Sequence, residues 1–176
     1  MTVGPDVSAF GASAIPAWSV LLVAGGWLSV IDAREHRLPN RIVLPAAAIG
    51  AGLIAASSIV EQDVAGLLRA LLGAVITFGA LLMLALPQAT GMGMGDVKLG
   101  LLTGMYLGWL GWSWLVLGLC VAFVLAGGWA VALLALGRAH RRTAIAFGPF
   151  MIIGVLACAI GAVALAFPMG AGGLSG

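Results

Sequence analysis

Two acidic residues, Asp32 and Asp96, are the strongest candidates for chemistry in this otherwise apolar chain. Asp96 follows three spaced glycines, Gly91, Gly93 and Gly95, and Asp32 closes an apolar run that begins at residue 12. An ionisable carboxyl at the edge of a bilayer is costly, so its presence there indicates a functional site. The two acids together therefore suggest a catalytic pair.

A pair of neighbouring carboxyls is suited to amide hydrolysis. One carboxylate activates a water molecule as a base, and the other protonates the leaving nitrogen. Like charges in a poorly solvated site cannot both ionise easily, so Asp32 and Asp96 would share one proton and titrate as a pair. The sequence does not say which of the two carries the proton.

The composition predicts an integral membrane protein rather than a soluble domain. Hydrophobic residues make up 62% and charged residues 8% of the 176 residues, and the mean hydropathy is +1.18. The 27 glycines fit lipid-embedded helices, which use small residues for close contact. A net charge of +2 is too small to indicate nucleic-acid binding, and Cys120 and Cys158 stand inside apolar runs without a zinc-site spacing.

Apolar runs long enough to cross a bilayer occur six times, which predicts an all-α, polytopic protein. The expected transmembrane helices cover residues 12–32, 42–60, 65–86, 96–111, 113–136 and 145–167. The residues before the first span lack Lys and Arg, unlike a cleavable signal peptide, so we expect that span to remain. The uncharged tail, residues 168–176, is expected to be disordered.

The basic residues predict the orientation of these spans. Seven of the eight fall on one side of the predicted bilayer, with only Arg69 on the other: Arg34, Arg37, Arg41, Lys98, Arg138, Arg141 and Arg142. Loops rich in Lys and Arg stay cytoplasmic, so both termini are expected outside. Asp32 and Asp96 then lie at one depth, the cytoplasmic face, while Trp109, Trp112 and Trp114 join an outer aromatic belt.

Small residues recur on one face of each helix that carries an acid. In the first span, Gly25, Ser29 and Asp32 share a face. In the fourth, Asp96 is followed by a glycine every four residues, which lets another backbone approach closely; these are Gly100, Gly104 and Gly108. We expect these two faces to pack together and bring the carboxyls into one site. Each feature alone also fits a helix end or general membrane packing.

The residues around the acids suggest supporting roles. Gly93 and Gly95 can adopt backbone angles closed to other residues, so an extended peptide could lie there; a flexible connector is the plainer reading. Asp96 itself would also suit a helix N-terminus. Lys98 is expected to reach the membrane interface, and Pro39 and Asn40 to start the second span, with Asn40 as its cap.

The chain resembles the prepilin peptidases, polytopic aspartic proteases named for a GxGD motif. The resemblance rests on Asp32 with Leu38-Pro39-Asn40, on the run Gly-Met-Gly-Asp-Val-Lys-Leu at 93–99, and on Phe147-Gly148-Pro149-Phe150. Ala146 stands where that family usually has proline. The resemblance implies that Asp32 and Asp96 are the catalytic aspartates and that Gly148 and Pro149 support the motif.

The resemblance also implies a substrate and a place in the cell. It implies cleavage of the basic leader of type IV prepilins or pseudopilins at the cytoplasmic face of a prokaryotic plasma membrane, with no cofactor. Bifunctional members also have paired CxxC motifs and methyltransferase activity. This chain has only two cysteines, and its compact form looks like the short peptidases of tight-adherence (Flp-type) pili, so we expect cleavage without methylation.

Other function classes remain open at this point. Intramembrane carboxyls also mark proton-coupled transporters, although acids at a membrane edge give no relay through its middle. A metal-dependent hydrolase would use Asp32, His36 and Asp96, which is a poor ligand set. A non-catalytic scaffold for pilus assembly, with or without homo-oligomers, is a further alternative.

Overall fold

The computed structural model describes residues 7–35, 40–87, 93–137 and 146–171, and these residues form a bundle of helices. Two short 3₁₀ turns, η1 (Val7–Phe10) and η2 (Ala12–Ala14), precede six α-helices. The helices are α1 (Ile15–Glu35), α2 (Asn40–Val60), α3 (Val64–Ala85), α4 (Met94–Leu110), α5 (Trp112–Ala135) and α6 (Gly148–Ala171). Within these residues there is no β-strand, and each predicted span overlaps one helix.

Five of the six helices are long and apolar enough to cross a membrane, which confirms a polytopic membrane protein. The exception is α4, which has 17 residues and lies at the centre of the bundle, with thirteen of them buried. A helix wrapped by its neighbours needs less of its own hydrophobic length, because protein rather than lipid surrounds it. The expected disordered tail is partly wrong, since α6 continues to Ala171.

Two tight turns keep consecutive helices antiparallel at the end of the bundle opposite the acids. Between α2 and α3, Gln62 adopts a φ of 55°, and the side chain of Asp63 accepts a hydrogen bond of 2.8 Å from the Gly66 N–H at the start of α3. Between α4 and α5, Gly111 has a φ of 133°, a conformation that only glycine adopts readily. These turns place the other ends of α3, α4 and α5 toward the acids.

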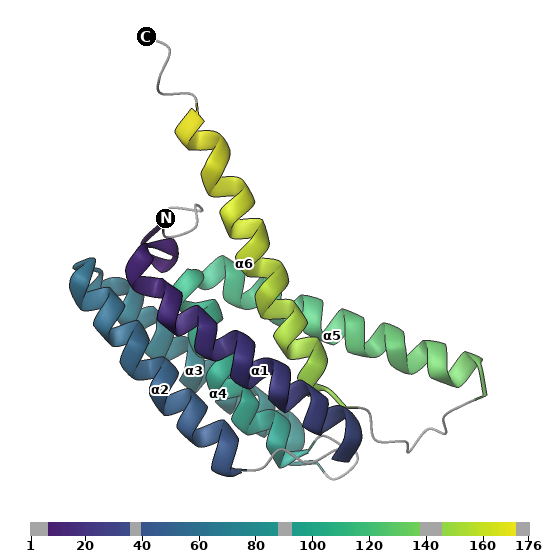
Figure 1. Ribbon diagram of the computed structural model, residues 1–176. Coiled ribbons are helices and arrows are strands. Elements are labelled where there is room, and N and C mark those ends of the chain that lie inside the picture. Colours follow the sequence, from purple (N-terminus) through teal and green to yellow (C-terminus); the bar gives the residue numbers. More distant parts are fainter. Residues whose placement is uncertain (1–6, 36–39, 88–92, 138–145, 172–176) are drawn as a thin grey trace.

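The packing order differs from the one expected from the small-residue faces. The most extensive contact joins α3 and α4, while α5 packs on α6 and α1 packs on both α2 and α6 (Figure 1). A Cβ added at Gly104 would lie 2.5 Å from the Gly73 carbonyl oxygen and from Cβ of Thr77. The glycine face of α4 therefore packs against α3 rather than α1, so this prediction is wrong.

The small-residue face of α1 has a different partner, α6. A Cβ at Gly25 would lie 2.8 Å from Cδ1 of Ile152. α1 contacts α4 through aromatic side chains instead: the rings of Trp18 and Trp109 stack with centroids 6.3 Å apart, and the Tyr106 hydroxyl donates to the Ala17 carbonyl. The faces predicted from the sequence exist, but α6 lies where α4 was expected.

The aromatic belt is also largely wrong. Trp109 is 1% exposed and Trp114 is 9% exposed, and only Trp112 reaches the surface, at 38%. Trp114 lies against α6, where a Cβ at Gly161 would be 3.4 Å from its ring. Trp109 stacks on Trp18 of α1 and Trp114 packs beside Gly161 of α6, so both rings fill helix interfaces.

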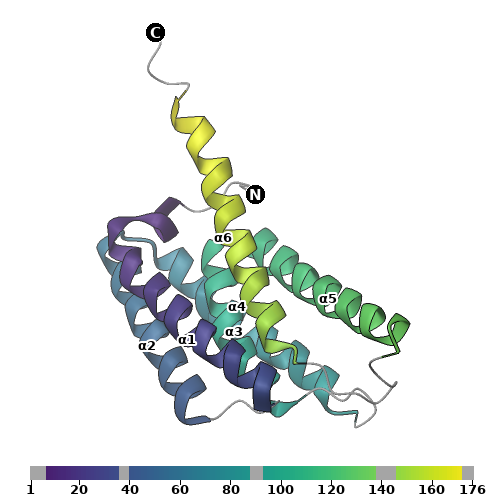
Figure 2. The same cartoon turned by 45° about the vertical axis from the view of Figure 1, so that its right-hand side comes forward.

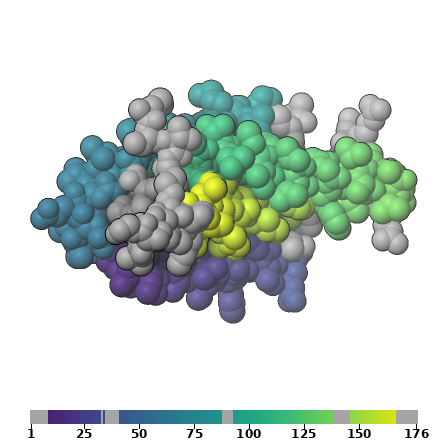
Figure 3. All heavy atoms as spheres, turned by 90° about the horizontal axis from the view of Figure 1, so that it is seen from above, coloured from purple at the N-terminus to yellow at the C-terminus, as the bar shows by residue number. Residues whose placement is uncertain are grey.

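Helix α5 separates from the rest of the bundle along its length. Its buried residues end at Ala126, and a Cβ added at Gly127 or Gly128 would meet nothing within 4 Å. The turned view and the view from above both show the C-terminal half of α5 projecting beyond the other helices (Figures 2 and 3). The part of α5 near Trp112 is thus held by α4 and α6, while its far half is not.

Candidate active site

Three helix ends meet at the lower end of the bundle in Figure 1: the C-terminal end of α1 and the first turns of α4 and α6. We call this end the site end. Asp32 lies in the last turn of α1, and Asp96 is the third residue of α4. The predicted acids therefore come from opposite termini of two different helices and lie at the same end of the bundle.

Both carboxyls are buried, and they lie close enough for their charges to interact. Asp32 is 4% exposed and Asp96 is 7% exposed. The charge of Asp32 acts on the Asp96 carboxyl, and the backbone of Gly93 interacts with that carboxyl as well. Two like charges buried side by side are costly to a fold, which is typical of a functional rather than a structural pair.

The first residue of α6 holds one of the acids in place. The backbone N–H of Gly148 donates a hydrogen bond of 2.9 Å to Oδ2 of Asp32. Because a Cβ at this position would lie 2.7 Å from that same oxygen and 3.3 Å from Cδ2 of Leu99, any side chain would displace the carboxyl. Leu99 is one helical turn beyond Asp96, so Gly148 sits between the two helices that carry the acids.

Pro149 explains why α6 can begin at this point. As the second residue of the helix it needs no intrahelical hydrogen-bond acceptor for its nitrogen, and its fixed φ suits a first turn. Phe147, the residue before the helix, is 8% exposed and packs its ring against Phe123 of α5, with centroids 4.9 Å apart. The segment 147–149 thus anchors the helix start that contacts Asp32.

The environment of the second acid differs from that of the first. Oδ1 of Asp96 is buried and has no hydrogen-bond partner among the described residues, whereas Asp32 accepts the Gly148 N–H. A buried oxygen without a partner usually marks a strained or functional group. Asp96 thus presents an acceptor that the fold itself does not use.

The glycines before Asp96 do not play the conformational role expected of them. Gly93 precedes α4 with a φ of −76° and a ψ of 146°, which any residue adopts, and Gly95 is the second residue of the helix. Neither is among the described residues with a positive φ. A Cβ at Gly93 would lie 3.7 Å from Oδ2 of Asp96, an ordinary contact. Any requirement for glycine here concerns space beside the acid rather than backbone angles.

Of the remaining predicted residues, Lys98 and Asn40 belong to helix ends near the two acids. Lys98 is partly exposed in the second turn of α4, and α2 begins at Asn40. Pro39, His36 and Gly91 lie outside the described residues. Among those that the structure describes, no three His, Cys, Asp or Glu side chains gather as metal ligands would. This finding does not test a metal set that includes His36, because His36 lies outside the described residues.

Two contacts at the site were not predicted from the sequence: the hydrogen bond from the Gly148 N–H to Asp32, and the packing of Phe123 on Phe147. The Gly148 N–H is a backbone group, and no residue type reveals where a backbone N–H points. Phe123 of α5 contacts Phe147, the residue that precedes α6, although the two are far apart in the sequence. The only sequence signal for either was the Phe-Gly-Pro-Phe run, whose glycine and proline indicate a helix start.

The family model and the curated relatives that match this chain all belong to the leader peptidases. The model of the type IV leader peptidase family matches residues 19–169. A prepilin leader peptidase/N-methyltransferase of Escherichia coli (strain K12) is 33% identical over 132 residues, which cover 72% of this chain and 55% of that protein. The corresponding protein of Stutzerimonas stutzeri is 34% identical over 144 residues, covering 78% and 47% respectively. No solved structure was found to match significantly.

The chain spans about half the length of these curated relatives. The matched region contains α2 to α5 in full and most of α1 and α6, and it includes Asp32, Asp96 and Gly148. None of these relatives is described as a transporter or a scaffold.

Proposed function

Since this chain belongs to the type IV leader peptidase family, we propose that it is an aspartic endopeptidase that removes the leader peptide of prepilin-like substrates. A single domain, residues 1–176, carries the activity. The observation on which the proposal rests is the pair of buried, mutually interacting carboxyls, Asp32 and Asp96, at the site end of the bundle. The substrate class is inferred from the relatives, and the reaction type is inferred from the two carboxyls.

The two carboxyls divide the work of hydrolysis. One of them, as carboxylate, accepts a proton from water while the water oxygen bonds to the scissile carbonyl carbon. The other, as carboxylic acid, protonates the amide nitrogen as the carbon–nitrogen bond breaks. The proton count is unchanged over the cycle, because the pair passes one proton on and gains one from water.

Gly148 positions one of these acids. Its N–H donates to Oδ2 of Asp32 and so fixes the direction of the other carboxyl oxygen of that side chain. Oδ1 of Asp96, which lacks a partner within the described residues, is the group that would contact the attacking water or the substrate. Lys98, Gly93, Gly95, Pro39, Asn40 and Pro149 remain proposed as support for the motif.

The site end is proposed to face the cytoplasm of a prokaryotic cell, with both termini outside. Among the described basic residues, Arg34, Arg41 and Lys98 belong to helix ends at the site end, and Arg69 lies near the opposite end. Loops rich in Lys and Arg remain cytoplasmic. The basic leader of the substrate would then be cut on the side where it is synthesised.

The deciding experiment combines the chain with a full-length prepilin in proteoliposomes and identifies the new N-terminus by mass spectrometry. We expect Asp32→Asn and Asp96→Asn to lower the cleavage rate by on the order of 10²–10⁴-fold, the size of a general acid–base contribution. Asp63→Asn is the matched control, because Asn also caps a helix and Asp63 lies at the opposite end. Cleavage at the wild-type rate by either active-site variant would remove that residue from catalysis.

A further inference from the structure

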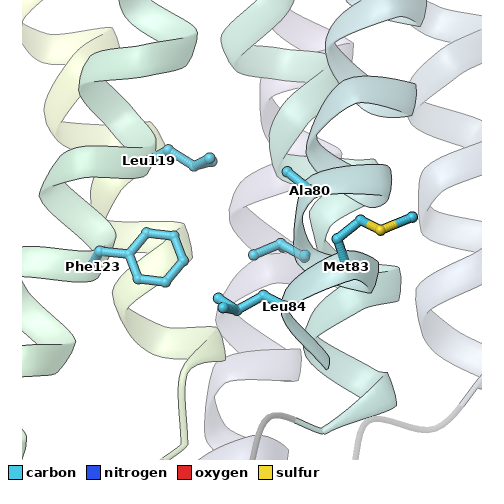
Figure 4. Close-up of a pocket in the computed structure, with 6 residues that line it drawn as sticks. Ala80, Met83, Leu84, Leu119 and Phe123 are labelled. Carbon is cyan, nitrogen blue, oxygen red and sulfur yellow. The ribbon is translucent and has the colours of Figure 1, made fainter. Parts of the chain in front are cut away.

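An apolar groove opens between α3 and α5, away from the two acids but connected to them. It has a volume of about 390 Å³. Six residues line it, and all are apolar: Ala80, Leu81, Met83, Leu84, Leu119 and Phe123. Figure 4 shows Leu119 and Phe123 projecting from α5 toward Ala80 and Leu84 of α3. The groove is thus a gap between two apolar helix faces that scarcely touch each other.

The groove exists because α5 is held by α6 rather than by α3. A Cβ at Gly154 of α6 would lie 2.6 Å from the Gly118 carbonyl oxygen, so the two backbones meet closely at that point. Beyond it α5 diverges from α3, and its buried residues end at Ala126. The helix axes of α3 and α5 therefore separate toward the site end.

Both walls of the groove lead to elements of the active site. On the α5 wall, Phe123 packs on Phe147, which immediately precedes the N–H that binds Asp32. On the α3 wall, Leu81 packs against α4, where a Cβ at Gly100 would be 2.7 Å from Leu81 Cδ1. Gly100 follows Asp96 by one helical turn. A molecule in the groove would thus touch Phe123, which packs on the residue before Gly148, and Leu81, which packs on the helix that carries Asp96.

From this continuity we propose that the groove holds the apolar helix of the substrate, the segment that follows the leader. The inference rests on the proposed peptidase function and adds the route by which the substrate is held. A chain cut at the membrane edge must continue into the bilayer beside the enzyme, and there it must be helical to satisfy its backbone. Lipid offers no hydrophobic gain between helices, so the enzyme can select such a helix only through shape.

The apolar lining and the exposure of the groove suit this occupant. An apolar helix presents side chains at positions i, i+3, i+4 and i+7 to a groove, as in helix-in-groove recognition generally. The exposed fractions of Leu84 and Phe123 are 40% and 38%, so a partner can bury additional surface on both walls. A lipid chain is the competing occupant, and the test below separates the two.

The first arm of the test is photo-crosslinking in the Asp96→Asn background, with full-length prepilin. The photoreactive residue p-benzoylphenylalanine is placed at position 119 or 84 in the groove. Matched control positions are 117 on α5 and 75 on α3, where Leu117 is 48% exposed and Val75 64% exposed. Both lie on helix faces turned away from the groove residues. We expect crosslinks from 119 and 84 to the apolar segment of the prepilin, and none from 117 or 75.

The second arm places a larger side chain in the groove and compares the cleavage rates of two substrates. The rate for full-length prepilin is divided by the rate for a short peptide that spans the scissile bond but lacks the apolar helix. We expect Leu119→Trp to lower this ratio about tenfold, the size of one lost hot-spot contact. Leu117→Trp, which adds the same ring on the lipid side of the same helix, is the control.

The possible outcomes distinguish failure of the docking proposal from failure of the peptidase proposal. Crosslinks to lipid alone, or equal crosslinks from control and groove positions, would refute the proposal that the substrate helix binds in the groove, even if the wild-type protein cleaves prepilin. An unchanged ratio in Leu119→Trp overturns it as well. Specific crosslinks from the groove together with no cleavage by the wild type would instead uphold the docking site and refute the peptidase proposal.

Discussion

The backbone N–H of Gly148, the first residue of α6, donates a hydrogen bond of 2.9 Å to Oδ2 of Asp32 in the last turn of α1. Helix α6 thus reaches one acid through its N-terminal backbone while Leu99 of α4 lies beside the same glycine. This contact ties three helix ends together around the proposed catalytic pair. It also explains why a residue without a side chain is needed at position 148.

Gly148→Ala should damage catalysis more than stability. The added Cβ would lie 2.7 Å from Oδ2 of Asp32, so the carboxyl must rotate away and lose its hydrogen bond. We expect kcat for prepilin cleavage to fall at least about tenfold, since loss of a charge-assisted hydrogen bond corresponds to about 1.5–3 kcal/mol. Gly128→Ala, on an open face of α5, is the control. Equal rates in the two variants would contradict a positioning role for Gly148.

Gly104→Ala should destabilise the bundle itself. Its Cβ would lie 2.5 Å from the Gly73 carbonyl oxygen and from Thr77, so α3 and α4 would have to separate. Overpacking of this kind costs about 1–3 kcal/mol. Thermal unfolding in detergent measures the effect, with Gly79→Ala of α3 as the control because a Cβ there meets nothing within 4 Å. If both variants melt at the wild-type temperature, the close α3–α4 contact is wrong.

Tyr106→Phe should weaken the contact between α1 and α4. The hydroxyl of Tyr106 is buried and donates to the Ala17 carbonyl, so its removal loses one buried hydrogen bond, about 0.5–1.5 kcal/mol. The midpoint of thermal unfolding should fall, and Trp129→Phe, at an exposed position of α5, should leave it within error. A larger loss in the Trp129 variant would argue against this assignment.

The product of cleavage should carry a free, unmethylated N-terminus. The sequence has two cysteines, Cys120 and Cys158, and so lacks the paired CxxC motifs implied for the bifunctional members that it resembles. Mass spectrometry of pilin processed by this chain, with S-adenosylmethionine supplied, tests this directly. One of the curated bifunctional relatives, assayed in parallel, supplies the methylated reference. A mass increase of one methyl group in the product of this chain would refute the prediction.

The orientation can be tested without any substrate. A reporter active only outside the cytoplasm should work when fused after residue 176, and a cytoplasmic reporter should work when inserted between residues 138 and 143, because Lys/Arg-rich loops stay inside. The reverse pattern would place the acids on the outer face. In that case the chain could not cut a leader before it is exported.

Much of this architecture could be predicted from the sequence. Lengths of apolar runs indicated six helices, because a helix must satisfy its backbone in lipid and rises by a fixed amount per residue. The cost of a buried charge singled out Asp32 and Asp96. Helical periodicity placed Gly25, Ser29 and Asp32 on one face, and the contacts of Gly25 with Ile152 and of Asp32 with Gly148 agree, since both partners belong to α6.

What no helix reveals by itself is which neighbour its faces meet. Every surface of a membrane helix is apolar, whether it touches lipid or protein, so hydrophobicity cannot separate the two. The glycines of α4 met α3 instead of α1, and Trp109 and Trp114 filled interfaces instead of facing the membrane edge. Local sequence sets the position of a small or large residue around one helix axis, whereas the partner depends on complementary shapes that only the assembled bundle brings together. The Gly148 N–H beside Asp32 is the clearest case, because its direction arises from the placement of α6 as a whole.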